Sequence, residues 1–446
     1  MDQSALPMDL PTAQGPAATM PTRLGEARLR RPVRNQVEMI ARDLDSMIGE
    51  NHSVRSIWEF LDRLDLSAFY HSIRAVLDRP GRPASDPQVL LALWVYATVE
   101  GIGSARHLAR LCEEHDAYRW LRGGVPVDYH LLADFRVKHQ EVLDELLTQV
   151  LAVLLKAEVV QLKRVAQDGM RVRASAGQAS FRRERSLEQC LEEAREQVER
   201  VAQVGEHPDP GVSQRERAAR ERAARERQER VEEALQQLPE VKAAKERQAR
   251  HAGKVRSANL QEPRVSTTDP AARKMKMSDG GFRPGYNVQL ATDTESQVIV
   301  GLSVSNRGTD QGEALGVEEQ VAQRTGKHPG AYLIDGGFVD LKDIEALERR
   351  EVKVYAPPKE NGGREVRYQC GAAGTQEVVA WRERMETEEA KAIYKERAAT
   401  SECVNALMRA RYGLGQFRVR GLPKVFCVIL LLVLTHNLLR WMSLTS

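Results

Sequence analysis

The stretch from Leu162 to Ala176, LKRVAQDGMRVRASA, constrains the fold most, because it places one carboxylate inside an extended segment of apolar and basic residues. Aspartate is uncommon within strands, since its side chain bonds its own backbone and favours hydration. Asp168 is therefore either a turn residue or a charge held for chemistry. Taken alone, a hairpin turn at Asp168-Gly169 accounts for the stretch as well as a catalytic carboxylate does. If Asp168 is catalytic, Gly169 is expected to make room for the close approach of metal or DNA.

The composition bounds the class of protein. A chain of 446 residues can form two or three domains whose cores need no disulfides. Its five cysteines are scattered and form no CxxC pair, which indicates a reducing compartment and neither a disulfide framework nor a cysteine zinc site. The net charge is only +3 although 29% of residues are charged, so a nucleic-acid surface would require basic groups to be segregated.

Two apolar or low-complexity segments need separate interpretation. Residues 1–33, rich in Pro, Ala and Gly, lack the pattern of a signal sequence and predict a disordered tail. The apolar run from Val425 to Leu434 is shorter than the roughly 20 residues that cross a bilayer. It predicts a buried helix and no membrane association.

Residues 34–158 show helical spacing and predict an all-α domain. Val37 to Leu77 carries an apolar stripe, and the run from Asp86 predicts two helices joined at Gly101-Ile102-Gly103, with Ser104 as the N-cap of the second. A tight glycine-containing joint between two short helices is typical of a helix-turn-helix. Glu141 to Val159 predicts a further amphipathic helix.

A third helix of this domain is predicted to begin after Asp128, its cap. Its Arg136, Lys138 and His139 could meet DNA phosphates. A plain three-helix bundle with ordinary surface bases is the alternative, and helix composition alone favours that alternative.

Residues 182–254 differ from the rest of the chain, because they are almost free of aromatics and rich in Arg, Glu, Gln and Ala. Mixed charges on a helical period stabilise a helix through i,i+4 pairs. We expect an insertion of long helices, interrupted near His207 to Pro210, that forms a helical hairpin. The alternative is an arm that binds DNA, which is the more specific and less favoured hypothesis.

The remaining segments alternate between strand and helix signals. Tyr286 to Thr292 and Val298 to Val304 have hairpin spacing, a helix follows over Glu313 to Thr325, and a short strand from Ala331 ends at Asp335. A helix over 341–350 and a strand over 352–356 complete the order. Three antiparallel strands followed by strand-helix units predict a mixed five-stranded sheet flanked by helices, an α+β fold.

In such a sheet the Asp168 strand and the strand that ends at Asp335 could be neighbours. Two carboxylates a few ångströms apart repel unless a cation lies between them, and oxygen ligands suit Mg²⁺ or Mn²⁺. Two such ions can promote attack on a phosphodiester and stabilise the leaving oxygen.

Glu402 is the best candidate for a third acid. With Asn405 and Arg409 it shares one face of a predicted helix, although a solvated helix face has the same spacing.

Other acids rank lower as ligands. Asp269 lies in a polar loop among Arg273, Lys274 and Lys276, where it could orient those bases or bind metal. Asp293 and Asp310 occupy turn or cap positions. His436, on the apolar C-terminal helix, is expected to be a hydrogen-bonded core histidine.

Several short motifs stand out along the chain. They are Asp168-Gly-Met-Arg-Val-Arg-Ala174, Thr268-Asp269-Pro270 with Lys274 and Lys276, Gly285-Tyr-Asn-Val-Gln289, Asp335-Gly-Gly-Phe338, Tyr394, Arg397, Glu402 and Arg409, and the C-terminal Arg420-Gly421-Leu422, Lys424 and Thr435-His436-Asn437-Leu438. These motifs resemble those of the DDE transposases of bacterial insertion sequences, and the N-terminal helices are similar to the transposase InsH-type DNA-binding domain. The resemblance extends from about Arg34 to Trp441 and leaves the tail and the charged insertion outside it.

The resemblance implies a ribonuclease-H-like catalytic domain, built from residues 159–181 and 255–446, in which Asp168, Asp335 and Glu402 bind Mg²⁺ or Mn²⁺ as two ions. It implies cutting at terminal inverted repeats and joining of the freed 3′-hydroxyl to target DNA, by a homodimer in the bacterial cytoplasm. Double-stranded DNA is the implied partner. The residues expected to meet it are Lys274, Lys276, Tyr394, Arg397 and Arg409, besides Arg136 and Lys138.

Two other hypotheses stay open. Gly336 and Phe338 stand where such proteins often have Ala and Tyr, and Arg409 stands where they often have lysine. These departures motivate a catalytically inactive DNA-binding relic or regulator that keeps the fold. A purely structural helical protein would leave the order of the acids unexplained.

Overall fold

The computed structural model describes residues 35, 37, 41–75, 82–206, 213–251, 262–358 and 375–445. The predicted tail, residues 1–33, lies outside this set, as do the predicted interruption at 207–210 and Cys370. Residues 44–446 form one compact unit.

The N-terminal part of this unit is all helical, as predicted. Asp86, Ser104 and Asp128 cap their helices, with Asp128 Oδ1 accepting from Leu131 N at 2.8 Å. The α3 helix is buried around most of its circumference, so it is a core helix, and a separate helix, α5, follows α4. The elements are η1 Asp45–Met47, α1 Ser53–Asp62, α2 Ser67–His71, α3 Pro87–Val99, α4 Ala105–Glu114, α5 Asp116–Arg122, α6 Tyr129–Lys138 and α7 Gln140–Lys156.

The mixed sheet has the strand order β6-β5-β1-β7-β8, and the short β4 lies beside the first residues of β5. Gly285 on β5 pairs with Arg173 of β1 and with Arg273 of β4, which places β4 on the same side of β5 as β6. Pairings among β6, β5 and β1 are antiparallel, whereas β1, β7 and β8 are parallel. The strands are β1 Arg164–Arg173, β4 Arg273–Lys276, β5 Phe282–Asp293, β6 Ile299–Ser305, β7 Ala331–Leu333 and β8 Lys353–Tyr355.

This order confirms the predicted mixed sheet flanked by helices, with β4 as an addition. The segment that holds Lys274 and Lys276 was expected to be a polar loop, but it pairs with β5 as a strand. Its alternation of exposed and buried residues covers only four positions, too few for the period of a strand to stand out.

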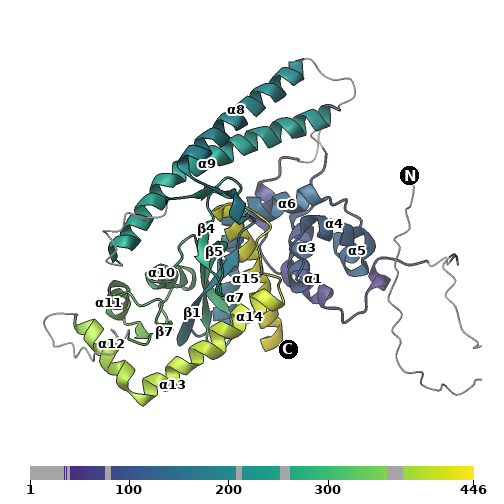
Figure 1. Ribbon diagram of the computed structural model, residues 1–446. Coiled ribbons are helices and arrows are strands. Elements are labelled where there is room, and N and C mark those ends of the chain that lie inside the picture. Colours follow the sequence, from purple (N-terminus) through teal and green to yellow (C-terminus); the bar gives the residue numbers. More distant parts are fainter. Residues whose placement is uncertain are drawn as a thin grey trace, which may run out of the picture. The chain divides into compact units, whose positions relative to one another are not determined.

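Helices pack on both the sheet and one another (Figure 1). The α10 helix packs on β5 and β6, while α15 packs on β6 and against α3, α6 and α7. The C-terminal helices that complete this region are α10 Ala314–Thr325, α11 Leu341–Arg349, α12 Gln376–Glu386, α13 Glu388–Arg397, the π-helix η3 Ala398–Glu402, α14 Cys403–Ala410 and α15 Leu422–Thr445.

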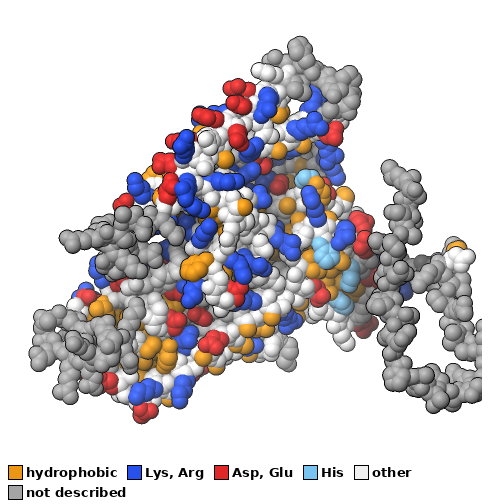
Figure 2. Space-filling view, viewed as in Figure 1, with side chains coloured by type: hydrophobic (Ala, Val, Ile, Leu, Met, Phe, Trp, Pro, Cys, Tyr) orange, Lys and Arg blue, Asp and Glu red, His pale blue; other side chains and the backbone are white. Residues whose placement is uncertain are grey.

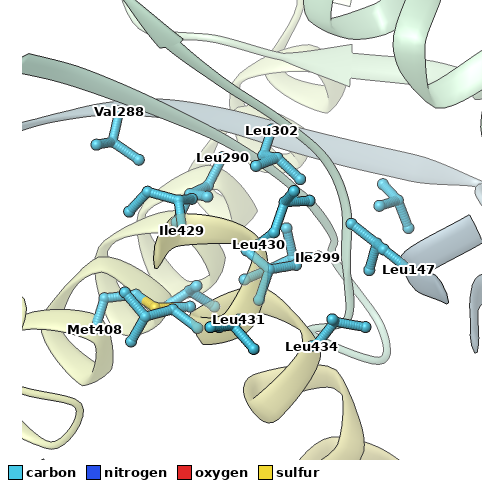
Figure 3. Close-up of a cluster of buried hydrophobic side chains, with 14 of the residues drawn as sticks. Leu147, Val288, Leu290, Ile299, Leu302, Met408, Ile429, Leu430, Leu431 and Leu434 are labelled. Carbon is cyan, nitrogen blue, oxygen red and sulfur yellow. The ribbon is translucent and has the colours of Figure 1, made fainter. Parts of the chain in front are cut away.

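The core centres on α15 (Figure 3). Val288 and Leu290 of β5 lie over Ile429 and Leu430 of α15, with Met408 of α14 beside them. By length and composition α15 alone among the described helices is apolar enough to cross a membrane, yet 67% of its most apolar window is buried inside the protein. It is a core helix here, as the run from Val425 predicted.

The charged insertion forms a helical hairpin, as predicted. The helices α8 Glu184–Glu206 and α9 Gln214–His251 run side by side (Figure 1). They are antiparallel, since Arg195 pairs with Glu232 whereas the later Gln197 pairs with the earlier Arg227. A small apolar cluster around Leu187 and Leu238 fixes the base of the hairpin. There the short strands β2 Phe181–Arg182 and β3 Val265–Ser266 pair, after the 3-10 turn η2 Gln178–Ser180.

Candidate active site

Asp168 lies in the middle of an unbroken strand. Its neighbours pair with β5 in continuous antiparallel register, Asp168 opposite Leu290 and Gly169 opposite Gln289, so the Asp168-Gly169 hairpin turn is wrong. Successive residues point to opposite faces of a sheet. Asp168 therefore shares the face of Leu290, which α14 and α15 cover, whereas Gly169 faces the other side.

The Asp168 carboxylate is held on both oxygens. Asn405 Nδ2 donates to Oδ2 at 2.9 Å, and the backbone N–H of Gly169 donates to Oδ1 at 2.9 Å. Burial raises the pKa of Asp168, the Arg397 charge opposes this, and the Asp335 and Asp310 charges add to it. The side chain is 19% exposed, so part of the carboxylate still faces solvent.

Asp335 follows the strand that lies beside β1. Arg164 to Ala166 pair in parallel with Ala331 to Leu333, as expected for neighbouring strands. The same register carried two residues further brings Asp168 and Asp335 alongside each other, which agrees with the effect of Asp335 on the pKa of Asp168. The Asp335 Oδ1 accepts from Gly337 N at 2.6 Å, so the Gly336-Gly337 turn orients this carboxylate.

Glu402 ends the π-helix η3, which packs on both β1 and β5. In an α-helix, positions i and i+5 are separated by one full turn plus about 140°, so their side chains point in different directions. The wider π turn brings these two positions onto the same side of the helix. Arg397 and Glu402 have this spacing, and Arg397 Nη2 lies 3.6 Å from Glu402 Oε1. π-helical turns occur frequently at functional sites.

Arg397 connects the two acids. Its Nη1 lies 3.9 Å from Asp168 Oδ1, and its side chain is 14% exposed. The ring of Tyr394 lies 5.7 Å from the Arg397 guanidinium carbon. A neighbouring ion pair, Arg164 with Glu396 at 2.9 Å, ties α13 to the start of β1. The basic, aromatic and acidic residues of the predicted third-acid segment therefore do meet the Asp168 strand.

Glu402, Asn405 and Arg409 were predicted to share one helix face, but their side chains do not contact the same part of the protein. Asn405 bonds Asp168, whereas the exposed Arg409 reaches Ser278 Oγ at 3.4 Å, in the β4–β5 connection. Asn405 thus supports Asp168 directly, a role that the shared helix face did not predict.

The oxygen donors suit a hard divalent cation, because Asp168, Asp335 and Glu402 offer only carboxylates. Asp168 and Asp335 lie on adjacent strands, but the Glu402 side chain is 65% exposed and turned to Arg397. Within the described ranges, no three or more His, Cys, Asp or Glu side chains form a group that could hold a metal ion. The donor chemistry of Asp168 and Asp335 fits Mg²⁺ or Mn²⁺, whereas Glu402 lies apart from them, 3.6 Å from Arg397 Nη2.

Basic residues predicted to meet DNA lie partly at the surface. Lys274 and Lys276 are exposed on the same face of β4, and Lys274 Nζ lies 5.1 Å from the centre of the Phe181 ring. Figure 2 shows Lys and Arg side chains over the area where Figure 1 labels β4 and β5. Lys138 is exposed but forms an i,i+4 pair with Asp134 at 2.7 Å.

Arg136 occupies a different environment from the one expected. It is 7% exposed, its Nη1 donates to the Gly103 carbonyl at 2.7 Å, and its guanidinium lies 4.4 Å from the Trp94 ring centre. Its burial depends on the α3–α4 joint and on the loop after α14, which α6 alone does not specify. Arg136 therefore does not lie on the open surface where it was expected.

The lower-ranked acids serve the fold. Asp269 is fully buried and accepts from Tyr286 Oη at 2.7 Å and from Gly421 N at 3.1 Å, so it links β5 to the start of α15 and does not orient Lys274 or Lys276. Asp293 caps its turn through Ser296 N, as expected. His436 is buried with Nε2 at 2.9 Å from the Gln297 carbonyl, which confirms a core histidine.

Asp310 is the acid that the sequence interpretation underrated. It lies on the Gly169 face, where Asn287 Nδ2 at 2.7 Å, Gln289 Nε2 at 2.8 Å and Arg171 Nη2 at 3.0 Å bind its carboxylate. The alternation of Asn287 and Gln289 on a strand of otherwise apolar residues was the available signal. Two amides on one buried face require a polar partner.

The chain matches two protein families. Residues 256–438 match the family described as transposase DDE domain, and residues 42–138 match the family described as transposase domain (DUF772). No curated protein and no solved structure matches the chain. The first match takes in the strands from β3 to β8, but not β1, which carries Asp168, and the second takes in the helical domain up to α6. The chain thus carries a DDE transposase domain and a DUF772 transposase domain, a pair typical of the transposases of bacterial insertion sequences.

Proposed function

We propose that this protein cuts the ends of a bacterial insertion sequence and joins them to target DNA by metal-dependent phosphoryl transfer. The observation that carries the proposal is that Arg397 lies between Asp168 and Glu402, while Asp335 follows the strand beside that of Asp168. Asp168 and Asp335 lie on adjacent parallel strands, and η3 brings Glu402 towards the same side of β1.

Asp168 and Asp335 would hold the metal, with Glu402 completing the set. A bound Mg²⁺ or Mn²⁺ pair supplies charge stabilisation for attack by a water or hydroxyl on the phosphodiester and for the leaving oxygen. Asn405 keeps the Asp168 carboxylate oriented. Arg397 balances the carboxylate charge before DNA binds and, being a fork of N–H donors, can then turn to a phosphate.

Lys274, Lys276, Tyr394, Arg409 and Lys138 would hold the DNA backbone outside the acids. Such contacts supply affinity that depends on salt and fix the register of the duplex, but they carry no sequence information. The two element ends must be handled together for joining, which favours a homodimer on DNA in the bacterial cytoplasm.

The function is tested with a labelled duplex that carries the element's ends, an unlabelled target duplex, and Mg²⁺ or Mn²⁺. The proposal predicts two labelled products, a cut end with a 3′-hydroxyl and a longer strand joined to the target. Absence of both products under either metal, with DNA binding retained, would reject it.

One observation favours a second function, that of a DNA-binding regulator without catalysis. Glu402 is mostly exposed and lies near Arg397, and no metal-binding group of three acids is formed among the residues placed by the structure. Titration of the DNA-bound protein with Mn²⁺ in a calorimeter separates the two functions. Salt-dependent DNA binding without any heat of Mn²⁺ binding supports the regulator, and saturable Mn²⁺ binding supports the transposase.

A further inference from the structure

The joint between α3 and α4 contacts the loop that follows α14. Gly101 and Gly413 both have a φ of +70°, and a Cβ at Gly413 would lie 2.7 Å from the Gly101 carbonyl oxygen. A Cβ at Gly101 would in turn lie 2.9 Å from the Arg411 carbonyl oxygen. Only glycine permits this approach without strain, so the helical domain and the Glu402-bearing segment are held in close backbone contact here.

A small cavity of about 50 Å³ opens at this joint. One water needs roughly 10–15 Å³ of such space, so the cavity has the capacity of a few water-sized groups, the range of a phosphate group. Apolar side chains form most of its lining. The polar side chains there are those of Arg136, Arg418, Thr98, Gln416 and Tyr412, and no Asp or Glu side chain lines it.

Arg136 enters this cavity as a buried charge without a carboxylate partner. Its Nη1 bonds a neutral carbonyl, its face rests on Trp94, and its Nε is buried with no hydrogen-bond partner. Burial lowers the pKa of Arg136 to about 10, with a further contribution from the Arg418 charge and none from an acid. A buried charge is costly unless a counter-charge and hydrogen bonds compensate it.

Arg418 adds a second charge of the same sign at the mouth. Its side chain is exposed, and its Cδ and Nε pass 3.7 Å from the Cβ position of Gly103. Across the ranges that the structure places, no ion pair involves either arginine. Two guanidinium groups at one cavity repel unless an anion lies between them, and their planar forks suit the oxygens of phosphate.

We propose that Arg136 and Arg418 form a binding site for a phosphate group at the joint between the helical domain and the catalytic domain. The bound oxyanion would accept from the unpartnered Arg136 Nε on the inner side and from Arg418 on the outer side. Either a DNA phosphodiester or a free phosphate ion offers this chemistry. The site goes beyond the proposed catalytic function and does not depend on it.

The free-ion arm of the test titrates the full-length protein with inorganic phosphate at constant ionic strength in a calorimeter. We expect binding to one site, weakened about tenfold or more in Arg418→Gln and partly restored in Arg418→Lys, which keeps the charge but not the fork. A matched loss of an exposed positive charge elsewhere, Arg220→Gln on α9, should leave this affinity unchanged. Arg136→Gln changes a buried residue and can disturb folding, so the test relies on variants of the exposed Arg418.

The DNA arm measures duplex affinity against salt concentration for the parent and Arg418→Gln. A slope reduced by about 0.9, the value for one phosphate, assigns the site to a DNA phosphodiester. An unchanged slope with lost phosphate affinity assigns it to a free ion. An unchanged slope, together with either no phosphate binding by the parent or equal phosphate affinity in Arg418→Gln, would overturn the proposal, whether or not the protein cuts DNA.

Discussion

The carboxylate of Asp310 fills the space beside the α-carbon of Gly169. A Cβ at position 169 would lie 2.3 Å from Asp310 Oδ1 and 2.7 Å from Gln289 Nε2. A chain of side-chain bonds continues from there, because Gln289 Oε1 accepts from Gln167, and Gln167 accepts from Tyr332 Oη at 2.6 Å. The polar network thus supports β1 from behind, directly next to the residue that carries the Asp168 carboxylate.

Gly169→Ala should destabilise the protein by about 1–3 kcal/mol, the usual range for overpacking. Asp310 can move away only by giving up its bonds from Asn287 and Gln289. Urea unfolding measures the change. Gly316→Ala is the matched control, since Gly316 lies exposed in α10 with nothing within 4 Å of its Cβ position, and it should be neutral or slightly stabilising. Equal stability of the two variants would contradict this role of Gly169.

The sequence predicted a close approach to Gly169, but it did not predict which group makes that approach. The sequence predicted that this glycine makes room for metal or DNA, whereas the side chain of Asp310 takes the space. Asp310 is 141 positions away along the numbering from Gly169, and a pairing over such a distance depends on the sheet order, which periodicity alone does not specify. Local signals did succeed, as the Asp128 cap and the Ala331 strand confirm.

His436 should make stability depend on pH below neutrality. Burial lowers the pKa of His436 to about 4. The unfolded chain takes up a proton near pH 6.5, so as pH falls from about 6.5 towards 4 the stability contribution is lost, at up to about 1.4 kcal/mol per pH unit. His436→Gln keeps a donor for the Gln297 carbonyl but cannot titrate. The loss of unfolding free energy between pH 7 and pH 5 should be smaller in this variant, and an equal loss would contradict the assignment.

Tyr286→Phe should cost about 1–3 kcal/mol of stability, because it removes a donor from a buried carboxylate. Asp269 Oδ1 would keep the Gly421 N–H but lose the phenol, and its Oδ2 lacks a hydrogen-bond partner. Thermal or urea unfolding gives the measurement. The exposed Tyr129 offers the control, since Tyr129→Phe removes a hydroxyl that meets solvent. A neutral Tyr286→Phe would show that Asp269 does not need the phenol.

Lys274→Gln combined with Lys276→Gln should weaken binding to duplex DNA and lower the salt dependence. If each lysine meets one phosphate, the slope of log affinity against log salt falls by about 1.8. Fluorescence anisotropy over a range of salt concentrations measures it. Lys391→Gln removes an exposed charge from α13, where Lys391 pairs with Glu388, and should leave the slope unchanged. A double variant that behaves like this control would exclude β4 from the DNA surface.

Two features of the site could not be obtained from the sequence, for physical reasons. The π turn of η3 sets Arg397 and Glu402 side by side, but residues 398–401 have no composition that distinguishes a π turn from an α turn. The burial of Arg136 depends on contact between α6, the α3–α4 joint and the loop after α14, which are far apart in the chain. By contrast, a strand that ends at Asp335 and packs beside β1 followed from the order of strands and helices.

The rate of end cleavage by conservative variants of the acids tests the central claim most directly. With Mg²⁺ and a duplex carrying the element's end, Asp168→Asn and Glu402→Gln should each lower the rate by about 10²–10³-fold or more, because charge stabilisation at the reacting phosphate is lost. Glu389→Gln, an exposed change on α13, should cleave like the parent. Cleavage at the parental rate by Asp168→Asn or Glu402→Gln would contradict the account.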